Sequence, residues 1–573
     1  MNSWIVVRRS GERIEELRAA FSGYKEISVD DVFAFYKRDD RFTEDQIFSG
    51  SDNEITLLDG VVLNLSELKK KYKVSDVFSV VRSIREKNQI YFREFIGPFC
   101  GFQYDVNTKE LIAYANQTGD VPLFYYHKDN TLIISNELNM IVDALKKFAI
   151  KYSFDETAAI YMMSFGYMID DRTFIKEIKR LLPGKYLYHK DGKIEQRIYF
   201  NLSFASKEIS IEEAVEKVDN AFRIAVKRCF DKDLEYRCPL HLVDASGGLD
   251  SRMVNWVAKD MGYSDLFNIS YSQSGTDEQR FAGKISSILG NTFIHEQLDD
   301  ASFIFDLEEI VEMEYGLAPY FAITGGRRLL SSLNMSQFGL EHTGQLGDVI
   351  LGTFTQKKLP VETRYKRYSD LLNVTVSTEI AAEYQDLEEF LIKTRGFLGM
   401  LATHLIRRHY TYAVSPFLDA EFISLCMSIP QELKRNHKLY WAWIDTKYPE
   451  AGKIESTRER PKGKIQSLSI RSVRKVSREA RKVLHTVGLS KSRVRTNNMN
   501  PFQYWFDTNP RIMEYVNNYY SNNISLLDPY PKTQDAARKM MILSNDPDKL
   551  LVLTVLATVR RYFGDEANGH AIK

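Results

Sequence analysis

Residues 240–251 read LHLVDASGGLDS, and this stretch is the most informative part of the sequence. Its first residues are apolar and predict a buried strand, and Gly247-Gly248 predict a turn before a helix that begins near Ser251. Backbone N–H groups at such a strand-to-helix turn converge on an anion, and the positive end of the helix dipole helps to hold it. Because glycine has no Cβ, the backbone can approach a phosphate closely. We therefore predict a phosphate-binding loop.

The polar side chains of this loop indicate what it binds. Ser246 and Ser251 supply hydroxyl donors, whereas Asp250 would repel a bare phosphate and is better explained as a magnesium ligand. The pattern is neither Gly-x-Gly-x-x-Gly nor Gly-x-x-x-x-Gly-Lys-[Ser/Thr], which argues against dinucleotide binding and against the P-loop NTPases. The alternative is a plain strand-to-helix turn in which the glycines only provide room. Ser, Asp and Ser at these offsets favour the phosphate loop.

Strand and helix patterns alternate around this loop, and a long amphipathic helix precedes it. Alternation of this kind predicts an open α/β fold with a parallel sheet. Helical spacing dominates after residue 300. The expected segments are a helix over 211–230, a strand over 240–243, a helix over 251–261, a strand over 266–271, a helix over 277–289 and a strand over 292–297.

The first two hundred residues have a different pattern, with short apolar runs separated by turn signals. They predict a layered α+β domain, so we expect one domain over residues 1–205 and a second over 206–573. The expected strands lie at 55–58, 99–104, 111–114, 122–126 and 132–135, and the expected helices at 75–87 and 136–148.

The composition is that of an ordinary globular protein. A chain of 573 residues exceeds a single core, and 44% apolar with 27% charged residues argues against disorder. Lys+Arg and Asp+Glu both number 77, so net charge does not favour nucleic acid. The four cysteines are widely spaced, and no segment is apolar enough to span a membrane or to act as a signal peptide. We expect a cytoplasmic protein that makes no membrane contact.

Further motifs of the second half support the phosphate loop and carry a resemblance. Residues 343–352 read TGQLGDVILG, residues 415–419 read SPFLD, and residues 458–464 read RERPKGK. With the loop at 246–251, these motifs resemble the class B asparagine synthetase family. The resemblance implies a pyrophosphate-loop (adenine nucleotide alpha hydrolase-like) α/β domain with helical C-terminal additions, which uses ATP and Mg²⁺ to adenylate a carboxylate.

The same resemblance implies roles for individual residues. Asp348 would be the second Mg²⁺ ligand opposite Asp250, and Lys462 or Lys464 would be a catalytic lysine on a mobile loop. Residues 246–251 would hold the pyrophosphate. The remaining expected ATP contacts, many of them through the backbone, are Asp244, Ile269, Thr343 and Gly344.

The first half resembles the glutaminase domain of the same family, an N-terminal-nucleophile αββα sandwich. The matching segments are DGVVLNLSEL at 59–68, GPFCGF at 97–102, PLFY at 122–125 and SNE at 135–137. By this resemblance Asn64 stands at an oxyanion-hole asparagine and Asp76 at a position that binds the amino group of glutamine.

Several residues depart from the family pattern. A glutaminase of this type needs a cysteine directly after the initiator methionine, but position 2 is Asn2, and we interpret Cys100 as a buried, inert thiol. Gln345 stands where relatives carry a Glu or Tyr that can take part in proton transfer, whereas an amide can only orient a substrate. Arg252 either pairs with phosphate or points along the helix surface.

We therefore predict an ATP-dependent amide ligase without glutaminase activity, with a remnant N-terminal domain. It would join a small-molecule or peptide carboxylate to ammonia or a substrate amine. The alternative is a non-catalytic nucleotide-binding or regulatory protein. The basic face over 471–482 is either a solvated helix or a docking site for an acidic protein; nucleic acid is the less favoured partner there. A homodimer is compatible with the sequence.

Overall fold

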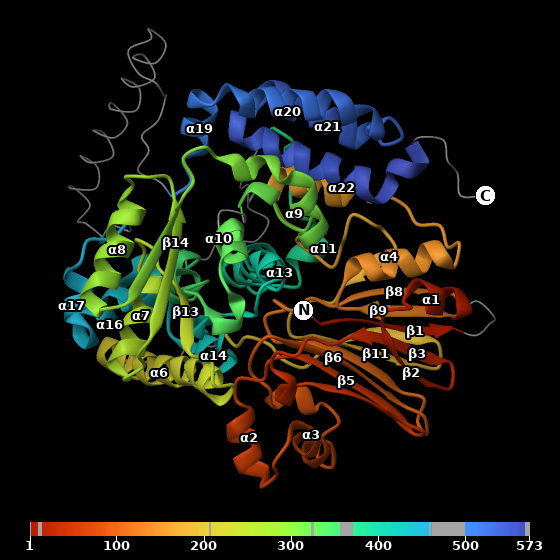
Figure 1. Cartoon of the computed structure of the whole chain (residues 1–573), viewed down its shortest axis with the longest axis horizontal. Helices are drawn as coiled ribbons and strands as arrows, with labels where there is room; N and C mark the ends of the chain where they lie inside the picture. Colours follow the sequence, from red (N-terminus) through yellow and green to blue (C-terminus); the bar gives the residue numbers. More distant parts are fainter. Residues whose placement is uncertain are drawn as a thin grey trace.

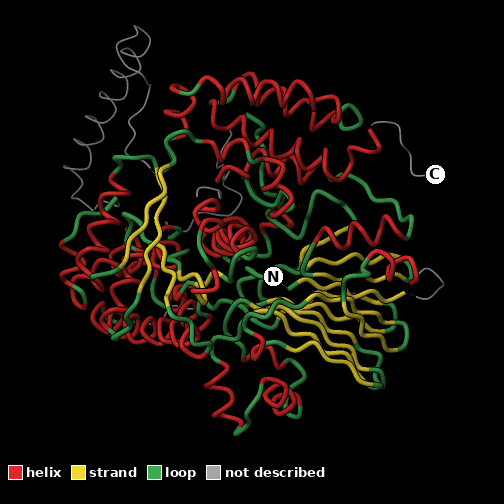
Figure 2. The backbone as a smooth tube through the Cα atoms, viewed as in Figure 1, coloured by secondary structure: helices red, strands yellow, loops and turns green. Residues whose placement is uncertain are grey.

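The structure is a computed structural model that describes residues 2–9, 14–204, 208–322, 326–355, 371–457, 460 and 499–567. Its strands form two antiparallel sheets in the N-terminal half and one parallel sheet in the C-terminal half (Figures 1 and 2). The chain is therefore an α/β protein of two parts. Lys462, Lys464 and the basic face over 471–482 lie outside the described residues.

Each N-terminal sheet has six strands. The first sheet has the order β10-β8-β9-β1-β3-β2 and the second has the order β12-β11-β7-β6-β5-β4. The strands are β1 (Ser3–Arg9), β2 (Lys25–Val29), β3 (Val32–Lys37), β4 (Ile47–Ser51), β5 (Glu54–Gly60), β6 (Phe99–Asp105), β7 (Leu111–Ala115), β8 (Phe124–Lys128), β9 (Thr131–Ser135), β10 (Ile178–Arg180), β11 (Lys185–Lys190) and β12 (Lys193–Ile198).

The two sheets pack face to face because alternate residues of their strands are apolar and point inward. Val6 and Ile134 come from the first sheet and Leu57 and Phe102 from the second, and all are buried in one cluster. Helices α1 (Ile14–Ala20) and α4 (Leu138–Lys147) cover the outer face of the first sheet, and α2 (Leu65–Tyr72) and α3 (Val77–Arg85) cover that of the second (Figure 1). This arrangement is the predicted αββα sandwich.

The C-terminal sheet has the order β15-β14-β13-β16-β17, with all its strands parallel. In sequence, one long helix precedes the first strand of this sheet, and one helix follows each of the first two strands, in the expected strand–helix alternation. The elements are α6 (Ile211–Glu235), β13 (Leu240–Asp244), α7 (Asp250–Asp260), β14 (Leu266–Ser272), α8 (Asp277–Leu289), β15 (Thr292–Gln297), β16 (Phe338–His342) and β17 (Ala413–Val414).

Helices make up most of the remaining chain. Four of them, α19 to α22, form a layer over both halves (Figure 1). The helices are α5 (Glu156–Phe165), α9 (Leu307–Glu314), α10 (Arg327–Ser332), α11 (Thr378–Ala381), α12 (Leu387–Leu391), α13 (Thr403–Arg407), α14 (Ala420–Ser428), α15 (Gln431–Lys434), α16 (Lys438–Lys447), α17 (Pro449–Lys453), α19 (Phe502–Thr508), α20 (Pro510–Asn523), α21 (Pro531–Leu543) and α22 (Lys549–Ala567).

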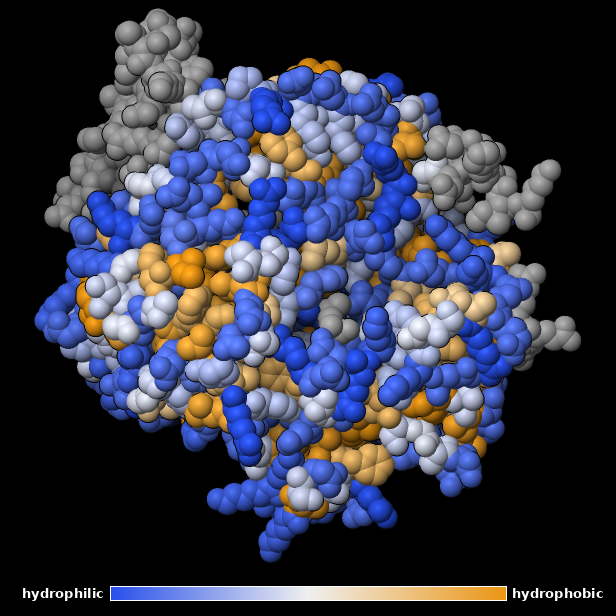
Figure 3. Space-filling view, viewed as in Figure 1, coloured by the Kyte–Doolittle hydropathy of each residue, from blue (hydrophilic) through white to orange (hydrophobic). Residues whose placement is uncertain are grey.

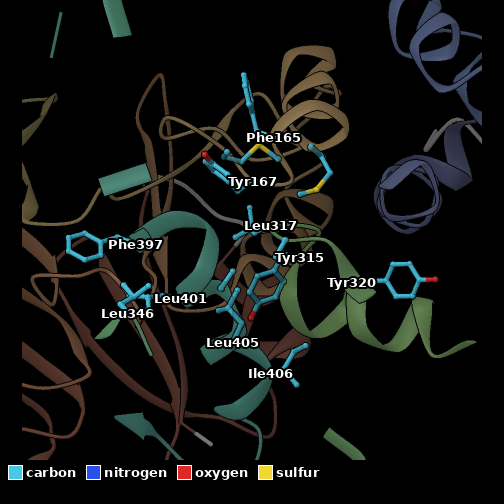
Figure 4. Packing of buried hydrophobic residues seen from close by; sticks show 14 of the residues in the cluster. Phe165, Tyr167, Tyr315, Leu317, Tyr320, Leu346, Phe397, Leu401, Leu405 and Ile406 are labelled. Carbon is cyan, nitrogen blue, oxygen red and sulfur yellow. The ribbon is translucent and has the colours of Figure 1, made fainter. Parts of the chain in front are cut away.

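One apolar core connects the two halves. It joins Phe165 and Tyr167 of the N-terminal half to Tyr315 and to Leu405 and Ile406 of α13 (Figure 4). Helix α13 lies near the centre of the molecule, between the antiparallel sandwich and the parallel sheet (Figure 1). The halves therefore share buried surface instead of meeting only at a linker.

Polar residues cover most of the visible surface, and an apolar area lies over β14 and α10 (Figure 3). A small cluster there has partly exposed members such as Phe267 and Met335. Among the described residues, no helix has the length and apolarity required to cross a lipid bilayer.

Candidate functional site

The loop after β13 joins the strand directly to α7, as the sequence predicts. The Ser246 N–H donates to Ser251 Oγ at 2.9 Å, the two serine hydroxyls lie 2.7 Å apart, and the Gly248 N–H donates to Ser246 Oγ at 3.2 Å. A Cβ on Gly247 would lie 2.7 Å from Thr457 Cγ2, so a larger residue would push the loop away from the segment that packs on it. The serines therefore hold each other at the start of α7.

A second segment packs directly against this loop. A side chain on Gly344 would clash with the Ser251 backbone N–H, and a Cβ on Gly347 would lie 2.8 Å from Asp250 Cγ. The tight glycine turn after β16 therefore lets residues 344–348 lie against the first turn of α7. Two motifs that are far apart in the sequence form a single surface.

That surface is one wall of an open cavity of about 380 Å³. The cavity brings together seven of the predicted site residues but not Gly247, Gly248, Ile269 or Thr343. Ile269 and Thr343 are buried, and both make backbone hydrogen bonds. The Ile269 carbonyl accepts from the Ala245 N–H, and the Thr343 N–H donates to the Val414 carbonyl. The seven that line it are Asp244, Ser246, Asp250, Ser251, Gly344, Gln345 and Asp348.

The two carboxylates suit a hard cation. Asp250 Oδ1 accepts a hydrogen bond from Tyr440 at 2.8 Å, and Asp348 Oδ2 accepts one from Thr353 at 2.6 Å. These bonds orient both carboxylates at the wall of the cavity. Carboxylate oxygens beside serine hydroxyls are the donor set that Mg²⁺ prefers, so the residues present fit the predicted metal.

A buried arginine also lines the cavity. Arg407 Nη1 pairs with Glu341 and with Asp244 Oδ2 (3.2 Å), and Nη2 donates to the Tyr271 hydroxyl at 3.1 Å. Burial raises the pKa of Glu341 above its usual range, although the Arg407 guanidinium lies against it. Arg407 and Tyr271 are not among the residues predicted from the sequence; the available signal was the pair of adjacent arginines, Arg407-Arg408, within an apolar helical segment.

Gln345 presents one free acceptor. Its Nε2 donates to Thr403 Oγ1 at 2.6 Å, and its backbone carbonyl accepts from Ser415 Oγ at 3.0 Å. Its Oε1 is buried and has no hydrogen-bond partner among the described residues. Gln345 lines the cavity, but this buried oxygen would accept a hydrogen bond from a substrate N–H only after the side chain moves.

Both expectations for Arg252 were wrong. The side chain is 1% exposed and donates to the backbone carbonyls of Ala451, Ile454 and Glu455 at 2.7–2.9 Å. Burial lowers its pKa to about 10. Helix α7 starts at the loop and turns this position inward, toward the end of α17, so Arg252 neither reaches the phosphate loop nor lies on the surface.

The N-terminal half contains a buried polar network at the start of the chain. Asn2 Nδ2 donates to Asp59 Oδ1 at 2.7 Å, and Asn2 Oδ1 accepts from the Asp39 N–H at 2.6 Å. Asp59 also accepts from Asn136 (2.8 Å) and from Tyr412 of the C-terminal half (2.9 Å). The position that a cysteine nucleophile would need is therefore occupied by an amide with both polar atoms bonded.

The two predicted remnant residues have structural contacts. Asn64 donates to Glu94 O at 2.9 Å and accepts from the Ile96 N–H at 3.0 Å, so its amide holds a loop. Asp76 is exposed and caps α3 by accepting from the Ser79 N–H at 2.9 Å. Cys100 is buried as expected, and burial raises the pKa of its thiol well above the usual value.

A separate buried triad joins α6 to strands β13 and β16 of the parallel sheet. His241 Nδ1 and His342 Nε2 each donate to Asp233 Oδ2 at 2.7 Å, and the ligand atoms of the three residues lie within 4.8 Å of one another. Burial lowers the pKa of His342 despite the neighbouring carboxylate. The two imidazole N–H groups and the Leu340 N–H satisfy this aspartate in the core.

Comparison with known proteins identifies the class of the first half. Residues 41–200 match a glutamine amidotransferase domain family. The N-terminal half therefore has a glutamine amidotransferase fold of the N-terminal-nucleophile type, and a parallel-sheet half follows it.

Two curated relatives are similar to part of the chain. "Amidase chyE" of Penicillium rubens is 24% identical over 258 residues, which cover 41% of this chain and 37% of the relative. "Amidase chry2" of Gibberella zeae is 19% identical over 252 residues, which cover 41% of this chain and 36% of the relative. The chain thus spans well under half the length of the curated relatives that it matches.

Two solved structures overlap about half of the chain. The first is an allosteric regulatory enzyme of purine biosynthesis, with a TM-score of 0.25 and 8% identity over 52% of this chain and 65% of that chain. The second is a glutamine phosphoribosylpyrophosphate amidotransferase from B. subtilis complexed with ADP and GMP, with a TM-score of 0.24 and 9% identity over 52% of this chain and 91% of that chain. Scores this low carry no structural argument.

Proposed function

We propose that this protein is an ATP-dependent amide-forming ligase related to the class B asparagine synthetases. The observation that carries the proposal is the meeting of Asp250 and Asp348 on one cavity wall, beside the hydroxyls of Ser246 and Ser251. Two carboxylates and an anion-binding turn are what a magnesium pyrophosphate leaving group requires. The glutamine amidotransferase domain and the amidase relatives agree with chemistry at an amide bond.

The proposed reaction has two steps. A carboxylate oxygen of the acid attacks the α-phosphorus of ATP, the bond to the β-phosphate oxygen breaks, and pyrophosphate leaves. A neutral amine or ammonia then attacks the carbonyl carbon of the acyl-adenylate, AMP leaves with the C–O bonding pair, and the nitrogen loses a proton to water. Mg²⁺ bound by Asp250 and Asp348 would neutralise charge on the phosphates.

Gln345 would orient the attacking nitrogen. Its Oε1 would accept one N–H of the amine after the side chain moves to expose this buried oxygen, and Thr403 holds the amide through Nε2. An amide cannot take the proton that the nitrogen loses, so the second step would depend on amine that is already deprotonated. We expect the rate of amide formation to rise with pH up to the pKa of the substrate amine.

Glutamine is not the proposed nitrogen source. Asn2 has no nucleophilic atom, and its amide is bonded at both ends to Asp39 and Asp59. Asn64 is likewise bonded to backbone through both polar atoms, so Glu94 and Ile96 fix the orientation of its amide. The N-terminal half would therefore serve as a structural part of the ligase, and free ammonia or a substrate amine would be used.

Pyrophosphate release tests the proposal. The full chain would be incubated with ATP, Mg²⁺ and a panel of small acids, peptides and amines, and pyrophosphate and AMP would be measured. Asp250→Asn and Asp348→Asn should each lower the release by about 100-fold or more, because charge stabilisation of the leaving group is lost. Glutamine should give no glutamate in any mixture.

A matched control separates loss of chemistry from loss of fold. Asp277→Asn changes a partly exposed aspartate in the first turn of α8 and should leave pyrophosphate release unchanged. ATP that binds without pyrophosphate release, across the whole panel, would instead support a nucleotide-binding regulatory protein. Full activity in Asp250→Asn would contradict the metal assignment.

A further inference from the structure

Helix α13 carries contacts to both halves on consecutive residues. Thr403 and Arg407 line the cavity and hold Gln345, Asp244 and Tyr271. Between them in sequence, His404 points to the N-terminal half, and the next residue after the helix, Arg408, does the same. All five residues of α13 are buried or half-buried, so the helix cannot shift without moving these contacts.

Asp120 is the N-terminal partner of His404. The His404 Nδ1–H donates to Asp120 Oδ2 at 3.2 Å, and both side chains are more than nine-tenths buried. Asp120 Oδ1 accepts from the side chain of Asn116 and from Thr118 Oγ1 at 2.8 Å, so the carboxylate is fixed on its own side. Burial opposes ionisation, but His404 and these donors outweigh it and hold the pKa of Asp120 below its usual value.

Neighbouring contacts support the same end of α13. Arg180 of the N-terminal half is buried and donates to Gly119 O at 2.8 Å and to Leu398 O at 3.4 Å. The Tyr167 ring packs on Gly399, where an added Cβ would lie 2.9 Å from its Cγ. Figure 4 shows Tyr167 of the N-terminal half in the same apolar cluster as Leu401 and Leu405. The N-terminal half thus supports the chain from residue 398 to residue 408.

We propose that Asp120 is a positioning residue for the candidate nucleotide cavity, acting through His404 on Thr403 and Arg407. The inference rests on the proposed function, because it assigns the amidotransferase-like half a role in the ligase site. That role requires no glutaminase activity. Asp120 does not line the cavity itself.

The test measures pyrophosphate release and ATP binding in the full chain. Asp120→Ala and His404→Ala should each raise the KM for ATP by about tenfold, with a smaller change in kcat, because a shifted Arg407 no longer holds Asp244 and Tyr271 in place. The double variant should be no worse than either single one, since both changes remove the same contact. His404→Asn keeps an N–H at the Nδ1 position and should restore a KM close to that of the wild type.

Asp45→Ala is the matched control. Asp45 is also a buried aspartate of the N-terminal half with a partner in the C-terminal half, Lys232 at 3.2 Å, but that partner lies on α6 and not on α13. It should lower thermal stability without changing the KM for ATP. Equal kinetic effects of Asp45→Ala and Asp120→Ala, or additive effects of Asp120→Ala and His404→Ala, would overturn the positioning role. A wild-type chain that neither binds nor cleaves ATP would overturn the proposed function, and this inference with it.

Discussion

Arg252 shows how a single charged residue can fix a loop from inside the protein. Its guanidinium donates to three carbonyls at the end of α17 and after it. The chain that continues from there bonds back to the loop after β13, since the Thr457 N–H and the Ser456 hydroxyl both donate to Gly247 O. The arginine therefore supports the loop through the segment that packs on it.

Replacing Arg252 should weaken both stability and nucleotide binding. Arg252→Met leaves three buried carbonyls without donors, and we expect the free energy of unfolding to fall by about 2–4 kcal/mol. Denaturant unfolding measures this loss, and calorimetric titration with Mg·ATP should show weaker binding. Lys259, a cation in the last turn of the same helix, provides the comparison: Lys259→Met should leave both quantities unchanged.

Restoring a cysteine at position 2 should not restore a glutaminase. In Asn2→Cys the thiol would face the Asp59 carboxylate, and a neighbouring negative charge disfavours the thiolate. Asn64 would also still be bonded to Glu94 and Ile96. Glutamate release from glutamine, measured after verified removal of the initiator methionine, should stay at the background level. Measurable hydrolysis would show that the N-terminal half can still bind and cleave glutamine.

At the scale of elements, α3 gives a test of the capping contact of Asp76. As the helix cap, Asp76 accepts from the Ser79 N–H and hydroxyl. Asp76→Ala should lower the free energy of unfolding by about 1 kcal/mol, the usual cost of losing an N-cap. Asp76→Ser should recover most of that loss. The proposed ligase activity should not change in either variant, whereas loss of a residue that binds a substrate amine would alter the KM for that amine.

The elements also show what the sequence could predict. Strong periodicity and capping residues defined α8 and β15 with the expected bounds, because Thr276 caps α8 and Gly290 ends it. Helix α6 runs beyond the expected end at residue 230, to Glu235, since Asp233 and Lys232 are buried by partners that local pattern cannot reveal. The joining of Asp250 and Asp348 followed from the motifs, but the inward turn of Arg252 and the role of α13 depend on tertiary contacts.

At the scale of the whole molecule, stability should depend on pH through the buried triad. The pKa of His342 is below its ordinary value of 6.5 in the folded state. In mild acid this histidine is therefore protonated in the unfolded chain but not in the folded one. Stability from this group is present above pH 6.5 and is lost as the pH falls, by up to about 1.4 kcal/mol for each pH unit. Denaturant midpoints between about pH 7.5 and about pH 5 measure this slope.

His342→Gln supplies the comparison for that experiment. A glutamine amide can still donate to Asp233 but does not titrate, so the variant should lose part of the slope even if it is less stable at neutral pH. An unchanged slope in His342→Gln would assign the acid sensitivity to other groups, such as His189, whose pKa burial lowers to about 4.

Helix α22 has a consequence for how the protein is made. It packs on α5 of the N-terminal half and on α9, and the Tyr562 hydroxyl donates to Asn139 at 2.9 Å while Tyr152 donates to Tyr562 O at 3.0 Å. On the ribosome, the sandwich emerges first and must wait for this helix with the apolar face of α5 uncovered. We therefore expect chaperones to bind the nascent chain and translation products that stop before α22 to aggregate.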